Sequence, residues 1–150
     1  MKEEIRDIQV LVKVIKVHPE AVLPTKATGG SAGFDLYSID SVEINPLPGG
    51  MTIRTGIAVE LPFGYEMQIR GRSGLAFREN IILHLGTIDQ DFRGEILIKV
   101  WNLGSAPLSI KKGERIAQAV VQKIEQVRLI EVSEISETER GTGGFGHTGR

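Results

Sequence analysis

The sequence predicts an all-β protein built from many short strands, a sandwich or a barrel, with one short helix and a mobile glycine-rich C-terminal tail. Two observations carry this prediction. The 18 glycines and 6 prolines are spread along the 150 residues, so the segments between turns are short. Those segments are rich in Val and Ile, and none shows the long apolar stripe of an amphipathic helix.

The individual strands are predicted from β-branched runs that end at turn signals. The run 94–102 is the clearest, because Ile96, Ile98 and Val100 alternate with residues that point to the other face. The run 115–124 also fits a helix, but its β-branched content and the preceding KKG turn favour a strand. The predicted strands lie within residues 8–17, 51–61, 65–71, 94–102, 115–124 and 127–132.

Two further segments complete the predicted architecture. Residues 73–80 (SGLAFREN) predict a short helix with Ser73 as its N-cap. From about Ser133 the apolar periodicity disappears and Glu, Ser, Thr and Gly dominate, which predicts a mobile tail. We therefore expect a barrel domain over residues 1–132 and a tail over residues 133–150.

The composition fits a globular protein, with 41% hydrophobic and 25% charged residues. The net charge of −1 predicts no nucleic-acid partner and no membrane partner, but it is compatible with a small phosphate ligand held by local charges. The absence of cysteine excludes thiol catalysis, and His18, His84 and His147 lack metal-ligand spacing. The N-terminal apolar run is interrupted by Lys13 and Lys16, so we expect no signal peptide and a cytoplasmic protein.

Two stretches in the first half of the chain place reactive or charged groups beside glycine. Asp35 follows Gly33, which permits close backbone approach; the alternative is a loop aspartate that caps a turn. Arg72 and Ser73 precede Gly74 at the start of the predicted helix. A guanidinium, a hydroxyl and free N–H groups suit an anion, whereas the alternative is an N-cap with a solvated arginine.

Two later stretches carry candidate catalytic groups. If residues 85–95 form a hairpin, Asp89 and Asp91 share one face of it. A carboxylate in that position can act as general base on a water molecule; the alternative is an Asp-rich turn. Gln118 lies on a predicted strand after a turn, and the alternative there is a half-buried amide satisfied by backbone groups.

The C-terminal RGTGGFGHTGR contains a formal G-x-G-x-x-G pattern at Gly141, Gly143 and Gly146. A dinucleotide site requires a helix after this pattern, and the four residues that remain are too few to form one. Glycine-rich backbone can instead present N–H groups to phosphates.

A single aromatic residue, Phe145, lies in this tail. A disordered end is the alternative explanation for the glycines, but an isolated aromatic is unexpected there. We therefore predict a lid, with glycine backbone on phosphate and the ring on a planar group. Arg140 and Thr148 would hold a terminal phosphate.

In order and spacing these stretches resemble the motifs of the trimeric dUTPase family (deoxyuridine 5′-triphosphate nucleotidohydrolases). The motifs are AGFDLYS, GRSGLA, GTIDQDFRGE, GERIAQ and RGTGGFGHTG, and the resemblance extends from about Ala27 to Gly149. It implies a jelly-roll-like β-barrel of mostly antiparallel strands and a homotrimer with active sites shared between subunits. It also implies hydrolysis of dUTP to dUMP and pyrophosphate with Mg²⁺.

The resemblance assigns roles to individual residues. Asp89 would be the general base for the water that attacks the α-phosphorus. Asp35 would act near Mg²⁺ through water, and Gln118 would contact the α-phosphate region. The residues implied to hold the phosphates are Arg72, Ser73, Gly74, Arg140, Gly146 and Thr148.

The resemblance also implies how uracil and sugar are recognised. Backbone groups of a hairpin around Leu83 to Ile88, with Gly86 and Thr87, would complement the hydrogen-bonding edge of uracil. With cytosine, the same backbone would place a hydrogen-bond donor opposite the amino group, which is also a donor. Phe92 stands where the family often has tyrosine, and its ring would leave no room for a ribose 2′-OH.

Phe145 would stack on uracil, and His147 replaces a serine that is frequent in the fifth motif.

There are two alternatives to a dUTPase. A dCTP deaminase of the same fold would need a glutamate to activate water at C4 of cytosine. A nucleotide-sensing protein would bind dUTP without turnover.

Overall fold

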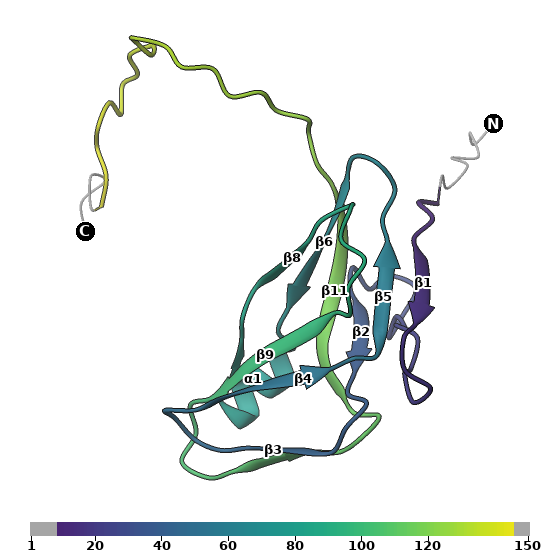
Figure 1. Cartoon of the computed structure of the whole chain (residues 1–150). Helices are drawn as coiled ribbons and strands as arrows, with labels where there is room; N and C mark the ends of the chain where they lie inside the picture. Colours follow the sequence, from purple (N-terminus) through teal and green to yellow (C-terminus); the bar gives the residue numbers. More distant parts are fainter. Residues whose placement is uncertain (1–8, 146–150) are drawn as a thin grey trace, which may run out of the picture.

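Short strands make up the folded part of the chain (Figure 1). The structure is a computed structural model that describes residues 9–145. The strands are β1 (Lys13–Lys16), β2 (Phe34–Tyr37), β3 (Val42–Ile44), β4 (Gly50–Arg54), β5 (Ile57–Glu60), β6 (Tyr65–Arg70), β7 (Ile81–Leu83), β8 (Gly86–Ile88), β9 (Leu97–Asn102), β10 (Leu108–Ile110) and β11 (Arg115–Lys123).

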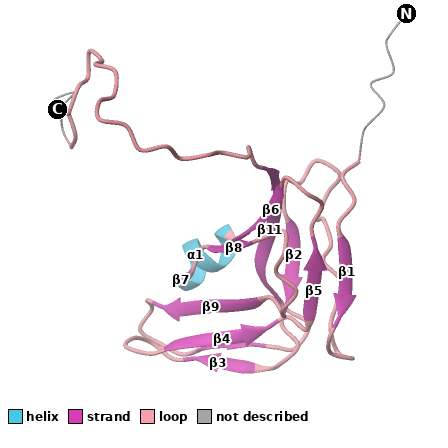
Figure 2. Cartoon of the chain, turned by 45° about the horizontal axis from the view of Figure 1, so that its top comes forward, coloured by secondary structure: helices cyan, strands magenta, loops and turns pink. Residues whose placement is uncertain are grey.

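All of these strands pair antiparallel. The largest sheet has the order β2-β11-β6-β8, a second has the order β4-β9-β7, and β1-β5 and β10-β3 form two-stranded ladders. Figure 2 shows β9, β4 and β3 crossing below the upright strands β11, β2, β5 and β1. The all-β prediction is confirmed.

The core forms where the buried faces of these sheets meet. Ile96, Ile98 and Val100 are almost completely buried, whereas Leu97 is 53% exposed, so the predicted alternation in this run is confirmed. The run from Arg115 is a strand and not a helix, and it contributes small buried residues such as Ala117 and Ala119 to the core.

One predicted strand is wrong. Residues 127–132 form no strand within the described chain, and Val127 and Leu129 are 80% and 93% exposed. A strand needs a partner for its backbone N–H and C=O groups. Both views show the chain leaving β11 and running away from the sheets, so this segment meets no such partner (Figures 1 and 2).

The predicted short helix is α1 (Ser73–Glu79), but its predicted N-cap is wrong. Arg72 occupies the N-cap position with an extended backbone, Ser73 is already helical, and no side chain caps the helix. Asn80 ends α1 in the left-handed conformation, which asparagine tolerates. No helix within residues 9–145 is long and apolar enough to cross a membrane.

Candidate active site

Asp35 lies between two arginines at one end of the largest sheet. It belongs to β2, and its side chain is only 14% exposed. Oδ1 lies 3.3 Å from Nε of Arg72, and Oδ2 lies 3.2 Å from Nη1 of Arg115. The loop alternative for Asp35 is therefore wrong, because the carboxylate sits on a strand and is paired on both oxygens.

Gln118 and Arg72 complete this group, which we call the Asp35 cluster: Asp35, Arg72, Arg115 and Gln118. Gln118 lies opposite Asp35 in the β2–β11 ladder, and its Nε2 donates to the Gly71 carbonyl at 2.9 Å. Arg72 donates from Nη1 to the Arg115 carbonyl at 2.8 Å and is 28% exposed, so it is not a solvated arginine.

Gly33 is what allows Gln118 to occupy its place. A Cβ at Gly33 would lie 2.5 Å from Oε1 of Gln118, a distance that real side chains do not reach. The neighbour that Gly33 admits is the Gln118 side chain and not another backbone, which was the expected neighbour. Ser73 and Gly74 follow Arg72 as exposed residues at the start of α1. Apart from the chain neighbours of Gly74 and the backbone of α1, no atom lies within 4 Å of a Cβ built on Gly74.

Arg115 was not predicted from the sequence. It opens β11 three residues before Gln118, in the same GERIAQ stretch. The sequence contained a signal for Arg115. A residue that lies next to a turn and close to Gln118 on the same strand is expected at the same end of the sheet as Gln118. Its pairing with Asp35 depends on a register shift between Arg115 and Ala117, which the sequence alone does not specify.

Asp89 lies on an exposed loop that follows β8. Exposure alternates before it: Thr87 is exposed, whereas Gly86 and Ile88 are partly buried. The Phe92 N–H donates to the Asp89 carbonyl at 3.1 Å and closes a turn. Asp89 and Asp91 are both exposed.

The predicted hairpins around this loop are wrong. β8 pairs with β6, whereas β7 and β4 pair with β9. Leu83 and Gly86 therefore belong to different sheets, and the His84 N–H between them donates to Lys99 of β9 at 2.9 Å. Each strand has a longer partner elsewhere, so the two short strands do not pair with each other.

The register places Asp89 far from the Asp35 cluster within one chain. Asp35 is level with Gln118 and Arg70, whereas Ile88 is level with Met67. Asp89 continues one residue beyond Ile88. The offset is about four residues, or on the order of 13 Å along the strands.

The tail residues also lie apart from both groups. Arg140 Nε donates to the Gly143 carbonyl at 2.8 Å within the tail, and Phe145 is fully exposed. Figure 1 shows this segment well away from the sheets. Gly146 and Thr148 lie outside the described residues. Across residues 9–145 no three His, Asp or Glu side chains gather to hold a metal ion.

The fold and these groups define a small antiparallel β-barrel in which two arginines pair with one aspartate at one end of the largest sheet. A family model described as dUTPase matches residues 19–149. The chain belongs to the dUTPase family, and its barrel is of the jelly-roll-like type.

Known proteins of this family resemble the chain over most of its length. It is 51% identical over 141 residues to the deoxyuridine 5′-triphosphate nucleotidohydrolase of Nautilia profundicola, covering 93% of this chain and 99% of that protein. It is 48% identical to the protein of the same name from Wolinella succinogenes, with 93% and 94% covered. The Staphylococcus bacteriophage 80alpha dUTPase, solved with dUPNHPP, matches with a TM-score of 0.88 and 27% identity, over 93% of this chain and 99% of that one.

Proposed function

We propose that this protein hydrolyses dUTP to dUMP and pyrophosphate, as a homotrimer and with Mg²⁺. The observation that carries the proposal is the match to the dUTPase family over residues 19–149, which includes every candidate group from Asp35 to Thr148. Hydrolysis of dUTP to dUMP follows from membership of the family. The roles of individual residues rest on the contacts described above and on the motif resemblance.

The Asp35 cluster would receive the phosphates. It contains two guanidinium groups and one carboxylate, so it keeps an excess of positive charge. Guanidinium groups bind phosphate oxygens strongly and can exchange a carboxylate for them. Arg72, with Ser73 and Gly74 beside it, would bind phosphate oxygens, and Gln118 would contact the α-phosphate region.

The residues present fit a Mg²⁺ ion that the substrate carries. Both oxygens of Asp35 face arginines, and residues 9–145 provide no cage of three ligands. Mg²⁺ keeps several waters and binds substrate phosphates readily, so one outer carboxylate is sufficient. Asp35 would hold the ion through water. When bound, Mg²⁺ neutralises part of the phosphate charge.

Asp89 would act as the general base. Its exposed carboxylate would take a proton from a water molecule as the water oxygen bonds to the α-phosphorus. The bond between the α-phosphorus and the α–β bridging oxygen breaks, and pyrophosphate leaves. The products are dUMP and pyrophosphate.

The uracil base and the deoxyribose of the substrate would be recognised close to Asp89. Backbone groups from Leu83 to Ile88, including Gly86 and Thr87, would bind the uracil edge. Phe92 is 42% exposed and would present one face of its ring to the deoxyribose. A 2′-hydroxyl would collide with that ring.

The offset of Asp89 along the sheet from the Asp35 cluster supports a site that is shared between chains. Exposed apolar side chains also point to assembly: Leu129, Ile130 and Ile135 are 93%, 71% and 87% exposed. We propose that residues 1–132 form the barrel domain, including the segment after β11 that leads to the lid. Residues 133–150 would form the lid, in which Arg140, Gly146 and Thr148 bind the terminal phosphate and Phe145 stacks on uracil.

The proposed function is tested by incubating the purified protein separately with dUTP, dCTP, UTP and dTTP, with and without Mg²⁺. We expect pyrophosphate release from dUTP, at a rate that falls when Mg²⁺ is removed. Ammonia released from dCTP would indicate a deaminase. Binding of dUTP without turnover would indicate a nucleotide sensor, and either result would refute the proposal.

The role of Phe92 is tested by Phe92→Ala. Removing the ring opens space under the sugar, so the kcat/KM ratio of UTP to dUTP should rise about tenfold or more. Steady-state kinetics on both nucleotides measures the ratio. An unchanged ratio in a folded variant means that Phe92 does not exclude ribose.

A further inference from the structure

The loop that carries Asp89 and Phe92 is held to the barrel where it begins. Gln90 Oε1 accepts the backbone N–H of Gly64 at 2.9 Å, at the turn between β5 and β6. Inside the loop, Arg93 Nη1 donates to the carbonyls of Gln90 at 2.7 Å and Phe92 at 2.9 Å. These bonds make the loop a closed unit, although its residues from Asp91 to Gly94 are exposed.

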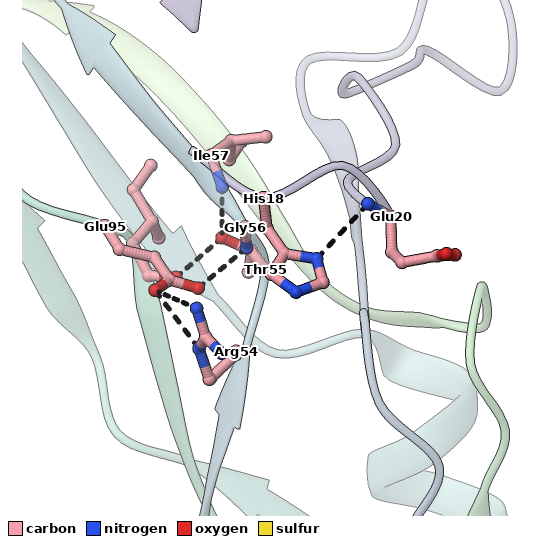
Figure 3. A network of polar contacts seen from close by, with 8 residues as sticks. His18, Glu20, Arg54, Thr55, Gly56, Ile57 and Glu95 are labelled. Atoms are coloured by element: carbon pink, nitrogen blue, oxygen red, sulfur yellow. Dashed lines mark hydrogen bonds and ion pairs between the residues drawn. The ribbon is translucent and has the colours of Figure 1, made fainter. Parts of the chain in front are cut away.

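Glu95 holds the other end of the loop (Figure 3). Its Oε1 accepts the Gly56 N–H at 2.8 Å, and its Oε2 accepts Nε and Nη2 of Arg54 at 3.2 and 3.0 Å. The Glu95 side chain is 19% exposed. Hydrogen bonding to Glu95 raises the pKa of Arg54 above its ordinary value.

The segment that Glu95 contacts is closely packed. Gly56 has a φ of +68°, and a Cβ there would lie 2.9 Å from side-chain atoms of both Ala21 and Ile39. Buried Thr55 donates to the Ile96 carbonyl at 2.6 Å. Glu95 therefore ties the loop to a closely packed turn between β4 and β5.

Gly94 directly precedes Glu95 in the chain, and the ring of Phe92 lies against it. A Cβ at Gly94 would lie 2.5 Å from Cζ and 2.9 Å from Cε2 of Phe92. Only glycine allows the ring to lie so close to the backbone. One face of the ring thus packs against Gly94, and the position of the ring depends on the position of Gly94.

We infer that Glu95 is a positioning residue for Phe92. By tying the loop to Arg54 and Gly56, Glu95 fixes the position of Gly94. The Phe92 ring, which selects deoxyribose, packs against Gly94. This inference rests on the proposed function for its consequence in sugar selection. The geometric part, the position of the ring, does not depend on activity. Nucleotide discrimination is therefore set partly by a carboxylate that touches no substrate.

The ring position is tested by NMR on protein labelled with [13C]glycine. The Gly94 α-protons lie beneath the Phe92 ring and should show an upfield ring-current shift in the wild type. Phe92→Ala should abolish the shift and so identify the signal. Glu95→Ala should reduce it, whereas Glu20→Gln, which breaks an ion pair with Lys112, should leave it unchanged.

The consequence is tested by the kcat/KM ratio of UTP to dUTP in the same proteins, each checked for folding by thermal unfolding. We expect the ratio to rise about threefold in Glu95→Ala and less in Glu95→Gln, which keeps an acceptor for the Gly56 N–H. Because Glu95 acts through Phe92, adding Glu95→Ala to Phe92→Ala should produce no further rise. A merely structural role would lower both rates and leave the ratio unchanged.

Three results would overturn the inference: a Gly94 shift that survives Glu95→Ala, an unchanged ratio in that variant, or a double variant in which the two effects multiply. If Glu95→Ala does not fold, Glu95→Gln must show the smaller change in both measurements. A wild type that shows the shift but does not turn over dUTP would refute the proposed function and leave the positioning of Phe92 intact.

Discussion

Asp89→Asn will lower kcat for dUTP by about 10²-fold or more while the nucleotide still binds. Asparagine keeps the size of the side chain and most of its hydrogen bonding but cannot accept a proton from water. The structure favours Asp89 over Asp35 for this role. Among residues 9–145 Asp89 forms no ion pair, whereas both oxygens of Asp35 are held by arginines.

Asp91→Asn is the matched control for this prediction. Asp91 lies two residues further along the same loop and is also exposed, but it has no assigned role. Its variant should stay within a few-fold of wild type. Single-turnover kinetics separates the chemical step from product release, and equilibrium binding of dUPNHPP checks the site. An Asp89→Asn enzyme with nearly normal kcat would remove Asp89 as the base.

Strands with a strong internal pattern were predictable from the sequence. The alternation of Ile96, Ile98 and Val100 is a local property, and burial follows it residue by residue. The strand over Arg115–Lys123 was also predictable, because its β-branched content follows directly after a turn. In both cases local preference and tertiary packing agree.

Contacts between distant segments were not predictable in the same way. β2 was not predicted, because FDLY is short and lies among turn-forming residues, and only pairing with β11 makes it a strand. Ser73 has the side chain of an N-cap, but the preceding Arg72 takes that position. Residues 127–132 have the composition of a strand and lack a partner in the described chain.

Removing residues 140–150 should leave a folded trimer and take away most of the catalytic efficiency. The described part of this segment is exposed or half-buried, so no core contact is lost. Arg140, Phe145 and Thr148 are removed together. Size-exclusion chromatography and thermal unfolding check the assembly, and kcat/KM for dUTP measures the loss. Normal hydrolysis by the truncated protein would show that the tail is not a lid.

The lid should close over a neighbouring subunit. From Lys123 to Phe145 an extended chain reaches up to about 70 Å, enough to cross to another barrel. Two inactive proteins test this. One carries Asp89→Asn with an intact tail, and the other keeps Asp89 but lacks residues 140–150. Each homotrimer alone should be nearly inactive. The two are then unfolded together, refolded at equal ratio, and checked by mass for mixed trimers.

The expected recovery follows from counting sites. If each base is closed by the tail of a neighbour in a cyclic trimer, random assembly joins an intact Asp89 to an intact tail in about a quarter of sites. Activity should therefore return to about a quarter of wild type, and it should follow the fraction of mixed trimers as the ratio is varied. A tail that closed over the Asp89 of its own chain would give no recovery at any ratio, because no single chain carries both parts. Mixed trimers without activity would thus refute the shared site, while the dUTP hydrolysis measured on the wild type would still stand.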